Sequence, residues 1–93
     1  MATLREAVIV DCIRTPIGKK GGTLAKVRSD DLGALVLREL VKRTGIDPEQ
    51  IDDVVAGCVT QIGEQGTNIG RNIVLCSGLP VSIPGTSVNR LCA

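Results

Sequence analysis

The sequence predicts an α/β fold, a βαβαβ arrangement with a mostly parallel sheet and helices on its faces. Three observations predict this class: short aliphatic runs recur along the chain, amphipathic stretches separate them, and turns rich in glycine and proline lie between. The order strand, helix, strand, helix, strand favours parallel pairing through right-handed crossovers. A length of 93 residues allows at most one small domain.

The first strand is expected within residues 7–13. Its run Ala7-Val8-Ile9-Val10 is apolar on both faces, which is typical of a parallel strand covered on both sides. Residues 14–18 break the strand, and the basic, glycine-rich residues 19–22 follow. Because this loop lacks the spacing of a P-loop, we expect a solvated, mobile loop and no phosphate site.

The clearest helix is expected to begin at Ser29 or Asp30, either of which can serve as its N-cap. Gly45 is expected to end it in the left-handed conformation. Its buried face is predicted from apolar residues at i, i+3, i+4 and i+8, namely Leu32, Leu35, Val36 and Leu40. Residues 47–50 then form a single capped turn with proline at its first helical position.

The second half of the chain repeats this order. Residues 53–59 are predicted as a strand, and a glycine-rich loop around residues 63–66 follows. A second helix is expected to start at Thr67 or Asn68 and to end at Gly78 and Pro80. The residues predicted on its apolar face are Ile69, Ile73 and Cys76. A last short strand is expected after residues 84–85 and runs into Cys92.

Composition excludes several classes of partner. Eleven basic and ten acidic residues leave a net charge of +1, and there is no aromatic residue, so neither an electrostatic footprint nor a stacking surface for nucleic acid is present. No apolar run approaches the roughly 20 residues of a membrane span, and the first residues lack the apolar core of a signal peptide. We therefore expect no nucleic acid and no membrane as partner, and a cytoplasmic protein.

The four cysteines are spaced too widely for a zinc knuckle or a redox pair, and the chain contains no histidine. We therefore expect no metal site and four reduced thiols. Cys12, Cys58 and Cys76 fall on a strand, a strand end and an apolar helix face, so these three are expected to be buried, inert packing residues.

Cys92 differs from the other three cysteines because it follows a strand and a polar stretch. No glycine, proline or charged tail follows Val88 and Leu91, so we expect the chain to be the front part of a longer protein. If Ala93 opens a helix, the free N–H groups and the dipole at that helix start favour a thiolate at Cys92. These features make Cys92 the candidate nucleophile.

Three segments in register resemble the thiolase family. They are Arg14-Thr15-Pro16-x-Gly18, Ile51-Asp52-Asp53-Val54-Val55-x-Gly57 and Pro84-Gly85-Thr86-Ser87-Val88-Asn89-Arg90-Leu91-Cys92. The most specific of the matching elements is Val-Asn-x-Leu-Cys, which is similar to the segment that carries the nucleophilic cysteine of thiolases. Lys20 departs from the pattern, since many members have an aromatic residue at this point of the first loop.

The resemblance implies an acyl-CoA C-acetyltransferase that forms or cleaves 3-ketoacyl-CoA through an acyl-cysteine at Cys92. It implies that Asn89 positions the cysteine loop, with packing or interface contact as the alternative role for Asn89 and Arg90. Coenzyme A and acetyl-CoA then act as substrates and no cofactor is bound permanently. Residues 1–93 are expected to be the first part of the N-terminal domain.

The resemblance also implies that other parts of the site lie outside this chain. These parts are an activating histidine, a second cysteine and the loops that hold CoA, so the remainder of a thiolase chain is an expected partner. Family members assemble as dimers or tetramers, and a homodimer or homotetramer is therefore expected. Without a histidine, this polypeptide alone is not expected to assemble the complete site.

Three alternatives remain open at this point. A ketoacyl-carrier-protein synthase also uses a cysteine at a strand end on a similar fold, although the quoted motifs favour a thiolase. The chain is otherwise a thiolase-like lipid carrier or interaction protein that kept the fold without the reaction. The third alternative is an inactive piece of a thiolase, which the absence of histidine favours.

Overall fold

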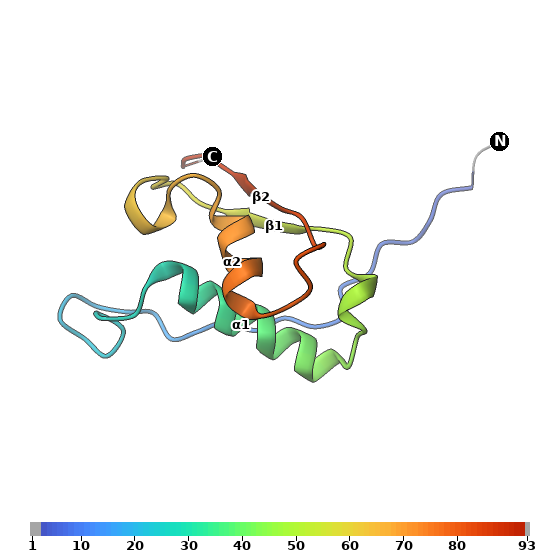
Figure 1. Ribbon diagram of the computed structural model, residues 1–93, viewed down its shortest axis with the longest axis horizontal. Coiled ribbons are helices and arrows are strands. Elements are labelled where there is room, and N and C mark those ends of the chain that lie inside the picture. Colours follow the sequence, from blue (N-terminus) through green and yellow to red (C-terminus); the bar gives the residue numbers. More distant parts are fainter. Residues whose placement is uncertain (1–2, 93) are drawn as a thin grey trace.

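The computed structural model describes residues 3–92. Two helices and two strands alternate along the chain, with one short 3-10 helix before the first strand and another before the second helix (Figure 1). In chain order the elements are α1 (Ser29–Thr44), η1 (Pro48–Gln50), β1 (Val54–Gly57), η2 (Gly63–Gln65), α2 (Ile69–Ser77) and β2 (Gly85–Val88). The α/β class predicted from the sequence is therefore confirmed.

The two strands pair in parallel, as predicted, with a register that runs from Val54 opposite Gly85 to Gly57 opposite Val88. Helix α2 packs on one face of this sheet, and α1 packs against α2 (Figure 1). On the opposite face the sheet presents exposed residues, among them Val55. Within residues 3–92 the helices thus cover one face of the sheet.

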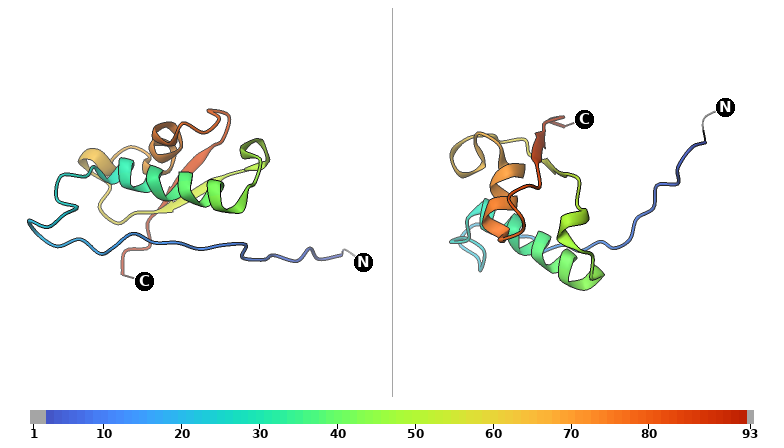
Figure 2. Two further views of the ribbon diagram at one scale, coloured as in Figure 1. Left: turned by 90° about the horizontal axis from the view of Figure 1, so that it is seen from below. Right: turned by 45° about the vertical axis from the view of Figure 1, so that its right-hand side comes forward.

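The first predicted strand does not form within the described residues. Residues 7–13 are extended but belong to no sheet, and Val8, Ile9 and Val10 are 74%, 89% and 78% exposed. A strand needs a neighbour for its backbone N–H and C=O groups, and an apolar strand needs layers on both faces. Residues 3–92 supply neither, and the segment runs as a single extended trace (Figure 2).

Helix α1 confirms the strongest helical pattern, with two corrections. It starts at Ser29 itself, and Arg28 holds the N-cap position without a side-chain cap, so neither Ser29 nor Asp30 is the cap that the sequence suggested. Leu35, expected on the buried face, is 52% exposed, whereas Ala34 is buried. The helix presents its smallest side chains to α2, because close helix packing requires them there. Gly45 ends the helix at φ 67°, as predicted.

Helix α2 begins at Ile69, and its N-cap Asn68 was one of the two predicted. Its buried face was predicted in part. Ile69 is buried as expected and Ile73 is half-buried, but Cys76 is exposed, and Val74 and Ser77 are buried instead. The backbone of α2 touches that of β2 at one point. A Cβ on Gly70 would lie 2.4 Å from the carbonyl oxygen of Thr86, so only glycine fits this helix-to-strand contact.

The core of the described residues is small and aliphatic, formed by Ala34, Ile69, Val74 and Ile83. It lies between α1, α2 and the turn before β2. Arg71 strengthens this turn, because its Nη1 donates to the carbonyl oxygens of Val81 at 2.8 Å and of Ile83 at 2.7 Å. None of the helices within residues 3–92 has the length and apolar character needed to cross a membrane.

Candidate active site

The candidate nucleophile lies just beyond the C-terminal end of β2, in residues 89–92, which we call the cysteine loop. The predicted last strand ends at Val88, four residues before Cys92, and a turn at Leu91 and Cys92 replaces its end. Cys92 is exposed, with a free thiol. The helix that was expected to open at Ala93 lies outside the described residues.

Asn89 gives the cysteine loop its shape. Its Oδ1 accepts the backbone N–H of Leu91 at 2.9 Å, which closes an Asx turn, and its Nδ2 donates to the carbonyl oxygen of Val59 at 3.3 Å. Leu91 has a φ of 50°, a conformation that a bulky side chain adopts only where the surroundings impose it. The side chain of Asn89 therefore sets the turn that immediately precedes the thiol.

The strand that leads to this loop is held by the N-terminus of α2. Asn68 Nδ2 donates to the carbonyl oxygen of Gly85 at 2.8 Å, and Asn68 Oδ1 accepts the hydroxyl proton of Ser87 at 2.9 Å. The Ser87 hydroxyl in turn accepts the backbone N–H of Gly70 at 3.3 Å. Because a cap residue and a helix N–H both bind β2, the strand has little freedom to slide along α2.

Residues 58–66, the η2 loop, lie beside the cysteine loop. The Cys58 N–H extends the sheet by donating to the Val88 carbonyl oxygen at 2.9 Å, and the Cys58 thiol donates to Gln65 Oε1 at 3.3 Å. Cys58 is half-buried and hydrogen-bonded, so it contributes more than the inert packing expected of it. Sequence spacing missed the role of this loop because its contacts join residues far apart in the chain.

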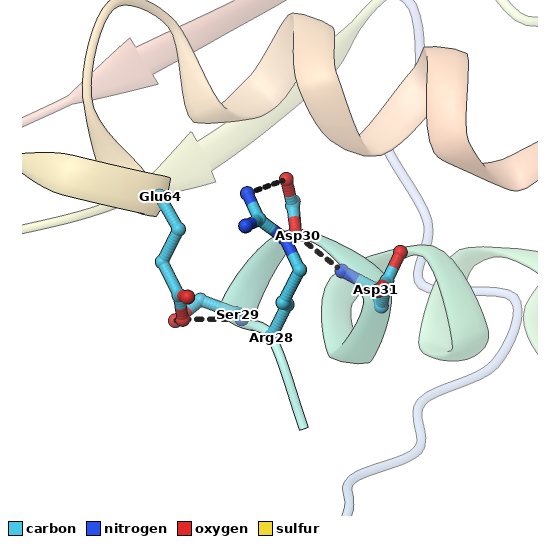
Figure 3. A network of polar contacts seen from close by, with 5 residues as sticks. All are labelled: Arg28, Ser29, Asp30, Asp31 and Glu64. Carbon is cyan, nitrogen blue, oxygen red and sulfur yellow. Dashed lines mark hydrogen bonds and ion pairs between the residues drawn. The ribbon is translucent and has the colours of Figure 1, made fainter. Parts of the chain in front are cut away.

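A polar network fastens the η2 loop to the start of α1 (Figure 3). Glu64 Oε1 accepts the backbone N–H of Ser29 at 2.8 Å and its hydroxyl at 2.7 Å. Both hydrogen bonds lower the pKa of Glu64, and the one from the Ser29 hydroxyl has the larger effect. Asp30 forms a bidentate ion pair with Arg28 through two hydrogen bonds, each 3.1 Å long. This contact lowers the pKa of Asp30.

Two of the other cysteines are not buried as predicted. Cys12 and Cys76 are exposed, which corrects the expectation that both are buried. Cys12 lies within the extended segment of residues 7–13, which does not join the sheet, and Cys76 is exposed on α2. Within residues 3–92 no cluster of histidine, cysteine or acidic residues has the composition of a metal site.

Two cavities lie at a distance from the thiol. One, of about 290 Å³, opens between residues 13–16 and α1, and another, of about 430 Å³, lies between α1 and β1. Cys92 lines neither of them. Arg90 is exposed, and its side chain makes no hydrogen bond or ion pair within the described residues. The structure therefore brings Asn89, Val59 and Cys92 together, without enclosing the thiol.

Comparison of the sequence with known protein families finds a match that includes the cysteine loop. The model of the thiolase N-terminal domain matches residues 7–93. The chain belongs to the thiolase family. The match begins at the extended apolar segment and includes Cys92, so it covers all the elements described above.

Curated relatives agree with this thiolase membership. The chain is 54% identical over 90 residues to the 3-oxoadipyl-CoA/3-oxo-5,6-dehydrosuberyl-CoA thiolase of Escherichia coli, covering 96% of this chain and 22% of that relative. It is 50% identical over 91 residues to the steroid 3-ketoacyl-CoA thiolase of Mycobacterium tuberculosis, covering 98% and 22%. The 3-ketoacyl-CoA thiolase of Bacillus subtilis is 50% identical over 91 residues, with 97% and 23% covered. The chain thus spans about a fifth of the length of these relatives.

Proposed function

We propose that this thiolase chain supplies the nucleophile for an acyl-CoA C-acetyltransferase that forms or cleaves 3-ketoacyl-CoA. One observation carries the proposal: in a member of the thiolase family, an exposed thiol at Cys92 follows the end of a parallel strand and an Asn89 turn. Residues 1–93 are then the first part of the N-terminal domain. The curated relatives named above are thiolases of 3-oxoacyl-CoA and 3-ketoacyl-CoA substrates, which supports this substrate class.

In the cleavage direction the Cys92 thiolate attacks the ketone carbon of the 3-ketoacyl-CoA. The carbon–carbon bond next to that carbon breaks, acetyl-CoA leaves as its enolate and takes up a proton, and the shortened acyl group stays on sulfur. The thiolate of a second CoA then attacks this acyl-cysteine, which releases acyl-CoA and restores the Cys92 thiolate. Covalent catalysis divides the difficult transfer into two easier steps.

The residues of this chain contribute the nucleophile and its support. Asn89 positions the cysteine loop, and the backbone N–H of Cys92 is available to donate to the oxyanion that develops at the attacked carbonyl. We propose that the base that deprotonates the thiol is the histidine that the resemblance to thiolases implies, which lies outside these residues because they contain none. CoA and acetyl-CoA are substrates, and no permanently bound cofactor or metal takes part.

The partners of the chain follow from the same proposal. They are the acyl-CoA substrate, the part of a thiolase that carries the remaining catalytic residues, and further copies in a homodimer or homotetramer. We also propose a cytoplasmic location for the protein.

The test is intact mass followed by peptide mapping of the native protein, incubated with and without acetyl-CoA. We expect one acetyl group on the peptide that contains Cys92, and its loss after addition of CoA. Cys92→Ser is expected to abolish acyl transfer without loss of folded structure, because the thiol is exposed. The matched control is Cys76→Ser, which removes another exposed thiol and should leave labelling and turnover intact.

Two results would contradict the assignment. Equal turnover by Cys92→Ser would exclude Cys92 as the nucleophile. Acetylation spread equally over Cys12, Cys76 and Cys92 would indicate nonspecific modification of exposed thiols. The absence of any label, in native protein that contains a complete thiolase chain, would favour the lipid-carrier or interaction role instead.

A further inference from the structure

Two neighbouring residues of the η2 loop bind the cysteine loop and the last residue of β2 before it. The carbonyl oxygen of Val59 accepts the Asn89 side-chain amide at 3.3 Å, and the N–H of Cys58 donates to the Val88 carbonyl oxygen at 2.9 Å. The position of the Val59 carbonyl therefore decides where Asn89 is held. Since the Leu91 N–H binds the other end of the same amide, any shift of Val59 passes directly to the turn before Cys92.

The η2 loop has little apolar packing to hold it in place. Val59 and Ile62 are 53% and 72% exposed. The loop relies instead on polar contacts of its own, because Cys58 donates to Gln65 and Gln61 Nε2 donates to the Cys58 carbonyl oxygen at 3.0 Å. These internal bonds make the loop a unit, but they do not fix its place relative to the helices.

Glu64 connects the η2 loop to helix α1. Within residues 3–92, the hydrogen bonds from the η2 loop to a helix outside it are those that Ser29 donates to Glu64 Oε1, at 2.8 Å and 2.7 Å (Figure 3). The N-cap residue Arg28 supplies no side-chain cap to α1, so the carboxylate takes the place of a local cap. A negative charge is favoured at the start of a 16-residue helix by the helix dipole.

We propose that Glu64 is a positioning residue for the cysteine loop: by fastening the η2 loop to α1, it holds the Val59 carbonyl where Asn89 binds it. The line of contacts runs from Ser29 through Glu64 to the η2 loop, and from Val59 through Asn89 to the turn before Cys92. Glu64 acts through these contacts and does not touch the reacting atoms. The proposal rests on the nucleophile role proposed for Cys92.

The kinetic test uses the native protein, purified with any polypeptide that accompanies these residues. Glu64→Ala should lower kcat by about tenfold or more and leave KM for the acyl-CoA within about twofold, because small displacements of a nucleophile chiefly cost rate. Glu64→Gln should restore kcat to within about threefold, since the amide oxygen still accepts both Ser29 hydrogen bonds. In an Asn89→Ala background, Glu64→Ala should lower kcat no further, because its effect passes through Asn89.

Glu49 offers a matched control within the same chain. It is an exposed glutamate at the middle position of η1 and is followed by glutamine, as Glu64 is in η2. Its side chain makes no hydrogen bond within the described residues, so Glu49→Ala should leave kcat unchanged. An equal loss of kcat in Glu49→Ala and Glu64→Ala would overturn the proposal.

Amide hydrogen exchange tests the positioning role of Glu64 independently of turnover. In Glu64→Ala the exchange rate of the peptide covering residues 89–92 should rise about tenfold, while the peptide covering β1 stays protected, and Glu64→Gln should restore the wild-type rate. No change at residues 89–92, or an equal rise in β1, would refute the positioning role. If the wild-type protein shows no acyl transfer, the proposed function fails, and these exchange rates still decide whether Glu64 orders the loop.

Discussion

The close contact between α2 and β2 predicts a large effect of adding a single methyl group. A Cβ at Gly70 would lie 2.4 Å from the carbonyl oxygen of Thr86 and 2.9 Å from its carbonyl carbon and nitrogen. An ordinary carbon–oxygen contact needs roughly 3.3 Å, so the helix and the strand must separate by about 0.9 Å. No rotamer change relieves this overlap, because the atoms that Gly70→Ala would meet belong to the backbone.

The size of the effect follows from three contributions. Overpacking costs about 1–3 kcal/mol. The separation also stretches the hydrogen bonds of Gly70 N–H to Ser87 and of Asn68 to the Gly85 carbonyl oxygen, each worth about 1 kcal/mol. The helix preference for alanine returns up to about 1 kcal/mol. We therefore expect Gly70→Ala to lower the free energy of unfolding by about 2–4 kcal/mol, a substantial part of the 5–15 kcal/mol typical of folded proteins.

Urea unfolding followed by far-ultraviolet circular dichroism measures this change, and it suits a chain that has no aromatic residue to report by fluorescence. Gly57→Ala is the control, because a Cβ at Gly57 in β1 would meet no atom within 4 Å and Gly57 does not have a positive φ. We expect Gly57→Ala to stay within about 1 kcal/mol of wild type. A Gly70→Ala midpoint equal to that of wild type, or to that of Gly57→Ala, would refute the reasoning.

Two further predictions follow from burial and from the acidic contacts at α1. Cys76→Ser should change the free energy of unfolding by less than about 0.5 kcal/mol, because Cys76 is exposed. Ser77→Ala should cost about 1 kcal/mol, because it removes a buried hydroxyl that donates to the Val74 carbonyl oxygen at 2.6 Å. The urea midpoints of the two variants check this, and equal losses would contradict it. Folding lowers the pKa of both Glu64 and Asp30, so their stabilising contribution is complete above their ordinary values of 4.5 and 3.8 and is lost as the pH falls through the lowered values. The urea midpoint should therefore decrease as the pH is lowered from about 5 to about 3, and the decrease should be smaller in Glu64→Gln. Equal acid sensitivity of the two proteins would exclude a contribution of the Glu64 carboxylate to stability.

The sequence predicted those features that depend on neighbours along the chain. Periodicity and turn residues located α1, α2, β1 and β2, and Gly45 was identified as the left-handed residue that ends α1. Asn68 was one of two residues proposed as the cap of α2. Cys92 and Asn89 were selected as site residues from their place after a strand and from the resemblance to thiolases, and their roles remain predictions.

Other predictions failed because they depended on what packs against each element. Residues 7–13 have the composition of a buried strand, but a strand forms only beside another strand, and the described residues provide no partner there. Leu35 and Cys76 fit an apolar helical face by spacing, yet both are exposed, since α1 and α2 meet through smaller residues near Gly33 and Ala34. Spacing along one helix cannot show which side its neighbour occupies.

By itself, the sequence determined the α/β class, the parallel order of its elements and the cysteine that follows the last strand, because propensity, capping and periodicity are local properties. Only the tertiary structure decided that Glu64 caps a helix 35 positions before it and that Asn89 binds the η2 loop 30 positions before it. Such contacts depend on where separate elements meet in space. The support of the candidate nucleophile therefore becomes visible only once the chain is folded.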